Sequence, residues 1–264
     1  MKLHDQHVHS HFSFDSEQSI EDYLIYSEKY EIEYFVLTDH YDFNHINTNK
    51  DLIFNIFKQE EELNRLHIKY PMVKILKGIE MGYKPSELER INSVLEKNNW
   101  DIVNLSLHEL DDIDYYYPDA FNKYGLVPTL FQYFLEQYKM VTNFDNFDVL
   151  CHVDYGFKTA YQIDQTINIK QYEDIVKKIM EVLINKGKAL EINTRVQETL
   201  PIEHTKYLLK LYKDLGGEYL TISSDAHDIS RFMKSFEKYI PIIKEVGFTY
   251  LTYFINREKY KYNI

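Results

Sequence analysis

The sequence predicts an α/β fold in which helices surround a parallel sheet that is either open or closed into a barrel. Short apolar runs rich in β-branched and aromatic residues recur along the chain, and segments with helical spacing separate them. This alternation continues over 264 residues without a Pro-, Gly- or Ser-rich linker, which favours a single domain, 1–264. The glycine-rich motifs of nucleotide-binding open sheets are absent, so a barrel is favoured.

Eight segments have the composition of buried strands, the last of them with the weakest pattern. They are residues 3–9, 34–39, 73–80, 102–107, 147–152, 189–194, 219–224 and 248–254. The helical segments between them are residues 20–30, 52–68, 87–97, 172–186, 203–215 and 232–246. Ser19 and Asp22 could cap the first helix, and Gly187 and Gly216 stand where two later helices should end. Residues 109–142 are interpreted as an inserted loop followed by a helix.

Composition excludes several classes of protein. Forty-two acidic and 30 basic residues give a net charge of -12, which would repel nucleic acid. The mean hydropathy of -0.45, with charges spread throughout, argues against a membrane span. Cys151 is the only cysteine and the amino terminus has no apolar stretch, so we expect a cytoplasmic protein without disulfides. The sequence does not predict an oligomeric state.

Six of the 11 histidines lie at or just after the carboxyl end of a predicted strand. His7 and His9 are two residues apart on one strand, so their side chains share a face, and Asp225 and His227 are spaced in the same way. The full set at strand ends is His7, His9, His40, Glu80, His108, His152, Asp225 and His227. Because the carboxyl ends of barrel strands form one concave surface, we expect these side chains to meet there.

Imidazole nitrogens and carboxylate oxygens are suitable ligands for zinc, manganese or iron, and the residue types do not choose among these metals. The set has more donors than one four-coordinate ion can use, so two or three ions are predicted. The remaining histidines lack this placement and are interpreted as surface residues or neighbours of the site. They are His4, His11, His45, His67 and His204.

Four short motifs together resemble those of the polymerase and histidinol phosphatase (PHP) superfamily. They are His7-Val8-His9, Thr38-Asp39-His40, Gly78-Ile79-Glu80 and Ser224-Asp225-Ala226-His227. Segments 7–16 and 37–40 look most like the histidinol-phosphate phosphatases of that superfamily. The resemblance spans nearly the whole chain. It implies a distorted parallel (β/α)7 barrel, similar to a TIM barrel, with three divalent metal ions at the strand ends.

The same resemblance implies a ligand set for each ion. The first ion would take His7, His9, Glu80 and Asp225; the second Asp15, His40 and His227; the third Glu80, His108 and His152. Glu80 would then bridge two ions. Asp15 comes from the loop after the first strand, and the alternative is that Asp15 or Ser16 caps the following helix.

The chemistry that the resemblance implies is phosphomonoester hydrolysis by a metal-bridging hydroxide, with the cations neutralising the phosphate oxygens. Asp225 or a metal-bound water could protonate the leaving alkoxide. Arg195 follows strand 189–194, where an arginine contacts phosphate in the phosphatase subgroup; a solvated surface arginine is the alternative. Lys158 is the only basic residue soon after His152, and it supplies charge without the bidentate geometry of arginine.

The resemblance therefore implies a metal-dependent hydrolase of L-histidinol phosphate, which releases L-histidinol and inorganic phosphate in histidine biosynthesis. Because metal ligands do not read the organic group, the alternative is a PHP phosphoesterase for another small phosphomonoester, such as a nucleotide or sugar phosphate. The acidic composition disfavours a DNA exonuclease. A binding module that holds metal ions without turnover is the alternative from a different class.

Overall fold

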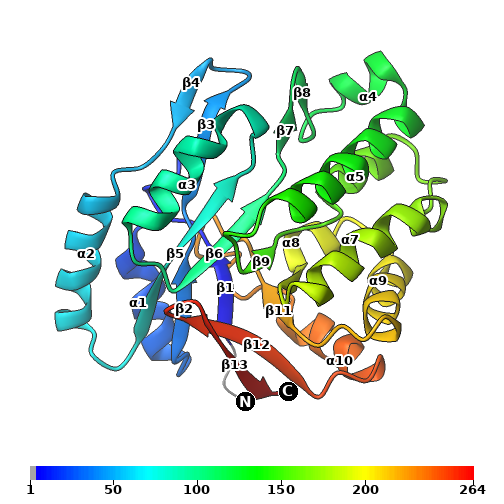
Figure 1. The fold of residues 1–264 in the computed structure, drawn as a ribbon. Coiled ribbons are helices and arrows are strands. Elements are labelled where there is room, and N and C mark those ends of the chain that lie inside the picture. The colour runs from blue at the N-terminus through cyan, green and yellow to red at the C-terminus, as the bar shows by residue number, and fades with distance from the viewer. Residues whose placement is uncertain (1–3) are drawn as a thin grey trace.

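Parallel strands curve into a nearly closed barrel in the computed structural model, which describes residues 4–264 (Figure 1). Within that range the barrel strands, in spatial order, are β1 (His4–Val8), β2 (Tyr34–Leu37), β5 (Lys74–Gly82), β6 (Ile102–Ser106), β9 (Val149–Leu150), β10 (Ala189–Asn193) and β11 (Leu220–Ser223). A parallel bridge between Val8 and Ala226 joins the two edges. The expected distorted (β/α)7 barrel is thereby confirmed, although Leu3 of the first predicted strand lies outside the described residues.

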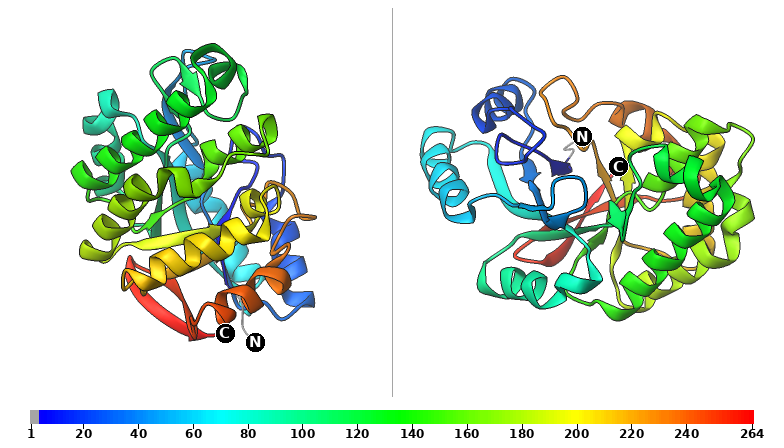
Figure 2. Two further views of the ribbon diagram at one scale, coloured as in Figure 1. Left: turned by 90° about the vertical axis from the view of Figure 1, so that its right-hand side faces the viewer. Right: turned by 90° about the horizontal axis from the view of Figure 1, so that it is seen from above.

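Helices cover the outside of the barrel, as the views in Figure 2 show. The helices are α1 (Ile20–Lys29), α2 (Ile56–Lys69), α3 (Leu88–Lys97), α4 (Asp119–Tyr124), α5 (Leu126–Asn143), α6 (Tyr155–Ile163), α7 (Glu173–Asn185), α8 (Thr194–Gln197), α9 (Ile202–Asp214) and α10 (Phe236–Glu245), with 3-10 turns η1 (Pro85–Glu87) and η2 (Ile169–Tyr172). Ser19 caps α1 by accepting a hydrogen bond from the Glu21 N–H, whereas Asp22 instead accepts one from Gln18. Gly187 and Gly216 have positive φ directly after α7 and α9, as predicted.

The barrel interior is divided into an apolar lower part and a polar upper part. Side chains from five strands fill the lower part, including Val36, Leu76, Ile102 and Ala189. A larger apolar layer lies between the sheet and the surrounding helices. Since apolar contacts fill the lower interior, the polar residues at the strand ends are left to face the upper opening.

The last predicted strand, residues 248–254, is present but is not a further strand of the barrel. Instead, β12 (Tyr250–Ile255) pairs antiparallel with β13 (Glu258–Asn263), and the hairpin crosses the lower end of the barrel (Figure 1). Phe254 packs into the lower interior cluster. Arg257, at the hairpin turn, holds Asp148 beneath β9 through Nε at 2.8 Å and Nη2 at 3.1 Å. The segment is therefore a plug for the amino-terminal end of the barrel.

Two excursions above the sheet were also not fully predicted. After β2 the chain forms the hairpin of β3 (His40–His45) and β4 (Lys50–Leu52). The supposed loop within residues 109–142 contains a second hairpin, β7 (Glu109–Leu110) with β8 (Ile113–Asp114), before α4 and α5. Both hairpins rise beside the barrel opening (Figure 1). Among residues 4–264, none of the helices has the length and apolar character needed to cross a bilayer.

Candidate active site

The carboxylate of Glu80 is the meeting point of five histidines at the upper end of the barrel. Its Oε2 lies 3.2 Å from His7 Nε2, 3.4 Å from His9 Nε2 and 2.8 Å from His40 Nδ1. Its Oε1 lies 3.1 Å from the Nε2 atom of His108 and 2.9 Å from that of His152. The strand ends therefore bring these predicted residues together, as the sequence led us to expect.

Two further carboxylates complete the cluster on the side of His227. Asp225 Oδ1 lies 3.2 Å from His9 Nε2 and 3.5 Å from His227 Nδ1. Asp15 Oδ2 lies 3.0 Å from His227 Nε2 and 3.7 Å from His40 Nε2. Asp15 thus faces the cluster, and α1 is capped by Ser19 rather than by Asp15 or Ser16. All nine residues predicted as ligands lie in one group.

Several buried atoms in this group lack a hydrogen-bond partner within residues 4–264, and they are the atoms that a cation would bind. They include His7 Nε2, His9 Nε2, His40 Nδ1 and Glu80 Oε2. Unpartnered buried polar atoms are costly, so their convergence calls for a ligand. Donor atoms from three subsets of the predicted ligands lie close enough to share an ion: His7, His9 and Asp225; His40, Glu80 and His108; and His9, His40 and His227. A fourth subset, behind the cluster, combines His7 with Cys151 and Glu191. Their imidazole and carboxylate character fits divalent metal ions.

The electrostatics agree with a cation site. Burial alone would raise the pKa of Glu80, but the facing imidazoles of His7, His40 and His108 hold that pKa well below its ordinary value. Burial lowers the pKa of His9 well below its ordinary value, and the neighbouring His227 and His40 lower it further. Glu80 is therefore an ionised carboxylate and His9 a neutral imidazole. Burial alone would lower the pKa of His7, His40 and His108, but the Glu80 charge raises it above the ordinary value, so a metal ion that binds them would displace their protons.

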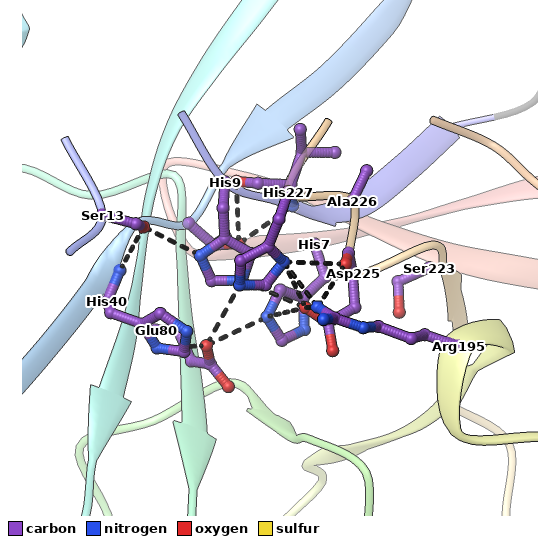
Figure 3. Close-up of polar contacts among 12 residues, drawn as sticks. His7, His9, Ser13, His40, Glu80, Arg195, Ser223, Asp225, Ala226 and His227 are labelled. Carbon is purple, nitrogen blue, oxygen red and sulfur yellow. Dashed lines mark hydrogen bonds and ion pairs between the residues drawn. The ribbon is translucent and has the colours of Figure 1, made fainter. Parts of the chain in front are cut away.

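Residues behind the cluster orient its imidazoles, and sequence reasoning assigned them no role. Glu191 Oε1 lies 2.8 Å from His7 Nδ1, and Asp42 Oδ1 lies 3.3 Å from His108 Nδ1. Ser13 Oγ lies 2.9 Å from His9 Nδ1 (Figure 3), and it donates a hydrogen bond of 2.8 Å to Asp39. The signal that could have revealed Glu191 is a lone charge inside an otherwise uncharged strand, β10.

His152 and Asp225 have unusual backbone conformations. Their φ angles are +25° and +51°, in a region that residues other than glycine rarely occupy. Such conformations persist where the surrounding structure fixes them, and they cluster at functional sites. Both lie just beyond a barrel strand, where the chain turns so that the side chain points into the cluster.

A cavity of about 310 Å³ opens directly above the cluster. Arg195, from α8, reaches over it and places Nη1 2.6 Å from His227 Nδ1 and 3.6 Å from Asp225 Oδ1 (Figure 3). Lys158, from α6, lines the same cavity between the rings of Tyr155 and Tyr116, at 4.3 and 5.2 Å from their centroids. The two predicted phosphate-binding cations therefore share a cavity with the histidine cluster.

Of the five histidines left out of the predicted ligand set, His45 lines the cavity above the cluster, and two others are buried elsewhere. His4 is buried, and its ring stacks on Tyr262 with 4.5 Å between centroids. His204 is buried with Nε2 2.8 Å from Asp154 Oδ2. His204 also borders a larger groove of about 480 Å³ between α6 and α9, which none of the predicted ligands lines.

Comparisons with known proteins agree with this geometry. The family model described as the PHP domain matches residues 5–195. A histidinol-phosphatase from Lactococcus lactis subsp. lactis is 32% identical over 96% of this chain and 95% of its own length. A probable histidinol-phosphatase from Thermotoga maritima is 30% identical over 94% of each chain.

A solved structure extends the agreement to the fold. The crystal structure of histidinol phosphate phosphatase from L. lactis, complexed with zinc, L-histidinol and phosphate, has a TM-score of 0.86 at 29% identity and covers 98% of this chain and 99% of its own. The class defined by this barrel and its histidine cluster is the metal-dependent phosphoesterase. The chain belongs to the PHP family, and within it to the PHP-type histidinol phosphatases.

Proposed function

We propose that the protein hydrolyses L-histidinol phosphate to L-histidinol and inorganic phosphate. The observation that carries this proposal is the cavity in which Arg195 and Lys158 stand over a cluster of histidines and carboxylates. Similarity to histidinol phosphatases over nearly the full chain supports the choice of substrate. We propose that this reaction is one step of histidine biosynthesis and that it takes place in the cytoplasm. A single domain would carry it out.

The proposed metal centre holds three divalent ions. His7, His9, Asp15, His40, Glu80, His108, His152, Asp225 and His227 would hold them, with Glu80 shared. Zinc is the first candidate, because the similar L. lactis structure is complexed with it, and manganese or iron would suit the same donors. When bound, such ions supply Lewis acidity and lower the pKa of water.

The side chains above the centre would bind and orient the phosphate. Arg195 offers a planar fork of N–H donors, and the pKa of its guanidinium is raised by Asp225 despite partial burial, so it is always charged. Lys158 adds a second positive charge from the opposite helix, α6. Together they would hold the phosphorus in line with an attacking water and its leaving oxygen.

Asp225 would then move protons during the displacement. The bond from phosphorus to the alcohol oxygen breaks and a bond to a water oxygen forms, while one water proton ends on the alcohol. Burial would raise the pKa of Asp225, but His7, His9 and Arg195 hold it well below its ordinary value. Asp225 is therefore ionised and cannot donate a proton until it has received one from the water; a metal-bound water is the alternative donor to the alkoxide.

The test is phosphate release from L-histidinol phosphate by metal-loaded protein, measured beside a panel of nucleotide and sugar phosphates. We expect selective turnover of histidinol phosphate that is abolished by the double variant His7→Ala, His9→Ala. Preference for another phosphomonoester would show that the proposed substrate is wrong and that the proposed phosphatase activity is right. Absence of turnover with zinc, manganese and iron would instead favour a module that binds metal without catalysis.

A further inference from the structure

We propose that Glu191 is a positioning residue that presents two ligands, His7 and His152, to opposite oxygens of Glu80. This inference rests on the metal centre of the proposed function. Glu191 lies in the middle of β10, with 3% of its surface exposed, beneath the floor of the cavity. It does not line the cavity, so its action must pass through its neighbours.

Both oxygens of Glu191 are fully used. Oε1 lies 2.8 Å from His7 Nδ1 and accepts a hydrogen bond from the Ser223 hydroxyl. Oε2 accepts the main-chain N–H of His152 at 2.7 Å and the side-chain amide of Asn193 at 3.3 Å. These partners come from β1, β10, β11 and the end of β9, so one carboxylate ties together four parts of the barrel wall.

The contact with His7 fixes a tautomer. An ionised carboxylate can only accept a hydrogen bond, so when a metal ion displaces the Nε2 proton of His7 the remaining proton sits on Nδ1, which faces Glu191. The lone pair is then on Nε2, which faces Glu80 Oε2 at 3.2 Å and Asp225 Oδ1 at 3.9 Å. A carboxylate behind an imidazole also strengthens the opposite nitrogen as a metal ligand.

The contact with His152 fixes the backbone conformation of that residue. The φ of His152 is +25°, and the hydrogen bond from its N–H to Glu191 holds the chain in this rare conformation. In that conformation His152 Nε2 lies 2.9 Å from Glu80 Oε1. Glu191 therefore sets the positions of two ligands that approach the two different oxygens of Glu80.

The experiment measures zinc affinity directly rather than activity. Wild-type protein and the variant Glu191→Gln are stripped of metal and titrated with zinc against a chelating indicator, and unfolding of the metal-free proteins is followed in denaturant. Glutamine keeps the size of the side chain, but its amide cannot accept from both His7 and His152. We expect at least one zinc to bind 10- to 100-fold more weakly, the range found for partners of metal ligands.

A matched control separates positioning from general stability. Asp148 is another buried carboxylate at a strand, but it is bonded to Val103 N–H and Arg257 at the opposite end of the barrel. Asp148→Asn should lower the stability of the metal-free protein and leave zinc affinity unchanged. If Glu191→Gln does not fold, Ser223→Ala removes only the hydroxyl that holds Glu191, and we expect zinc binding weakened by about two- to tenfold.

Three outcomes would overturn the inference. The first is that the Glu191→Gln and Ser223→Ala variants both bind zinc as tightly as the wild type. The second is that Asp148→Asn loses as much zinc affinity as Glu191→Gln. The third is that His7→Ala binds zinc as tightly as the wild type. The last would overturn the proposed metal centre as well. A wild-type protein that binds zinc through His7 but does not hydrolyse histidinol phosphate would overturn only the proposed substrate, because the zinc titration does not depend on turnover.

Discussion

The two ends of the barrel each bury a carboxylate, and they treat it in opposite ways. At the lower end Asp148 receives two hydrogen bonds from Arg257 and one from the Val103 N–H, so its charge is fully matched. At the upper end Glu80 faces five imidazoles, and its Oε2 has no hydrogen bond from residues 4–264. A saturated carboxylate anchors the fold, whereas an unsaturated one leaves bonding capacity for a ligand.

The variant Glu80→Gln should break this comparison most strongly. It removes the negative charge that faces His7, His9 and His40 on one side and His108 and His152 on the other, so metal binding should fail. Loss of several kcal/mol of electrostatic stabilisation of the transition state corresponds to about a 1,000-fold fall in kcat/KM. Metal content by elemental analysis and phosphate release measure the two effects. Because the facing imidazoles hold Glu80 ionised in the metal-free protein, the variant should also unfold at a lower denaturant concentration, so both measurements are made on protein shown to be folded. A variant that keeps its metal and its rate would show that Glu80 is not a ligand.

Arg195→Ala should have the next largest effect. Arg195 is the cation nearest the cluster, and removal of one donor that stabilises developing charge typically costs about 100-fold or more in rate. We expect a higher KM and a lower kcat, with metal content unchanged. Arg195→Lys should recover part of the loss, because lysine restores charge without the bidentate geometry. Unchanged kinetics in Arg195→Ala would make this arginine a surface residue, the alternative that its sequence position left open.

At the lower end, Arg257→Met should affect stability and not chemistry. It leaves the Asp148 carboxylate partly buried without its cation, which should lower the free energy of unfolding by about 2 kcal/mol. Denaturant unfolding measures this change, and kcat/KM of the folded fraction should equal that of the wild type. A large fall in kcat/KM would mean that the β12–β13 hairpin affects the active site, and that the two ends of the barrel do not act independently.

The upper end could be predicted from sequence to a greater extent than the lower end. Histidines and carboxylates are rare enough that their repeated placement after apolar runs identified the cluster from His7 to His227, and parallel topology then required those residues to converge. The lower end depends on which strands pair. Residues 248–254 have a strand pattern, but composition does not distinguish a barrel strand from one arm of a hairpin, and the decisive partner is β13.

Residues that support the ligands were missed for a related physical reason. The lone charge of Glu191 in β10 is a local signal, but its partner His7, at 2.8 Å, is 184 positions away in the chain, and no local pattern identifies that contact. His4 and His204 became buried because aromatic rings and Asp154 surround them, which again depends on tertiary packing. Sequence thus indicates which side chains can do chemistry, whereas their orientation is set by long-range contacts.

The smallest effect that we predict concerns pH and Lys158. Burial of this side chain between Tyr155 and Tyr116 lowers the pKa of its ammonium to about 8, so it is charged below that pH and loses its charge above it. A phosphate dianion should bind less well once the charge is lost. We therefore expect KM to rise several-fold as the pH increases through 8, by roughly the 1 kcal/mol of a partly exposed charge pair.

Lys158→Met is the matched control for this pH dependence. Methionine keeps an unbranched apolar stem against the two tyrosine rings but carries no charge at any pH. Its KM should already be raised at pH 7 and should show no further rise near pH 8, while kcat changes less than in Arg195→Ala. If the wild-type rise in KM persists in Lys158→Met, another group is responsible, and phosphate binding at the upper end depends on Arg195 without help from Lys158.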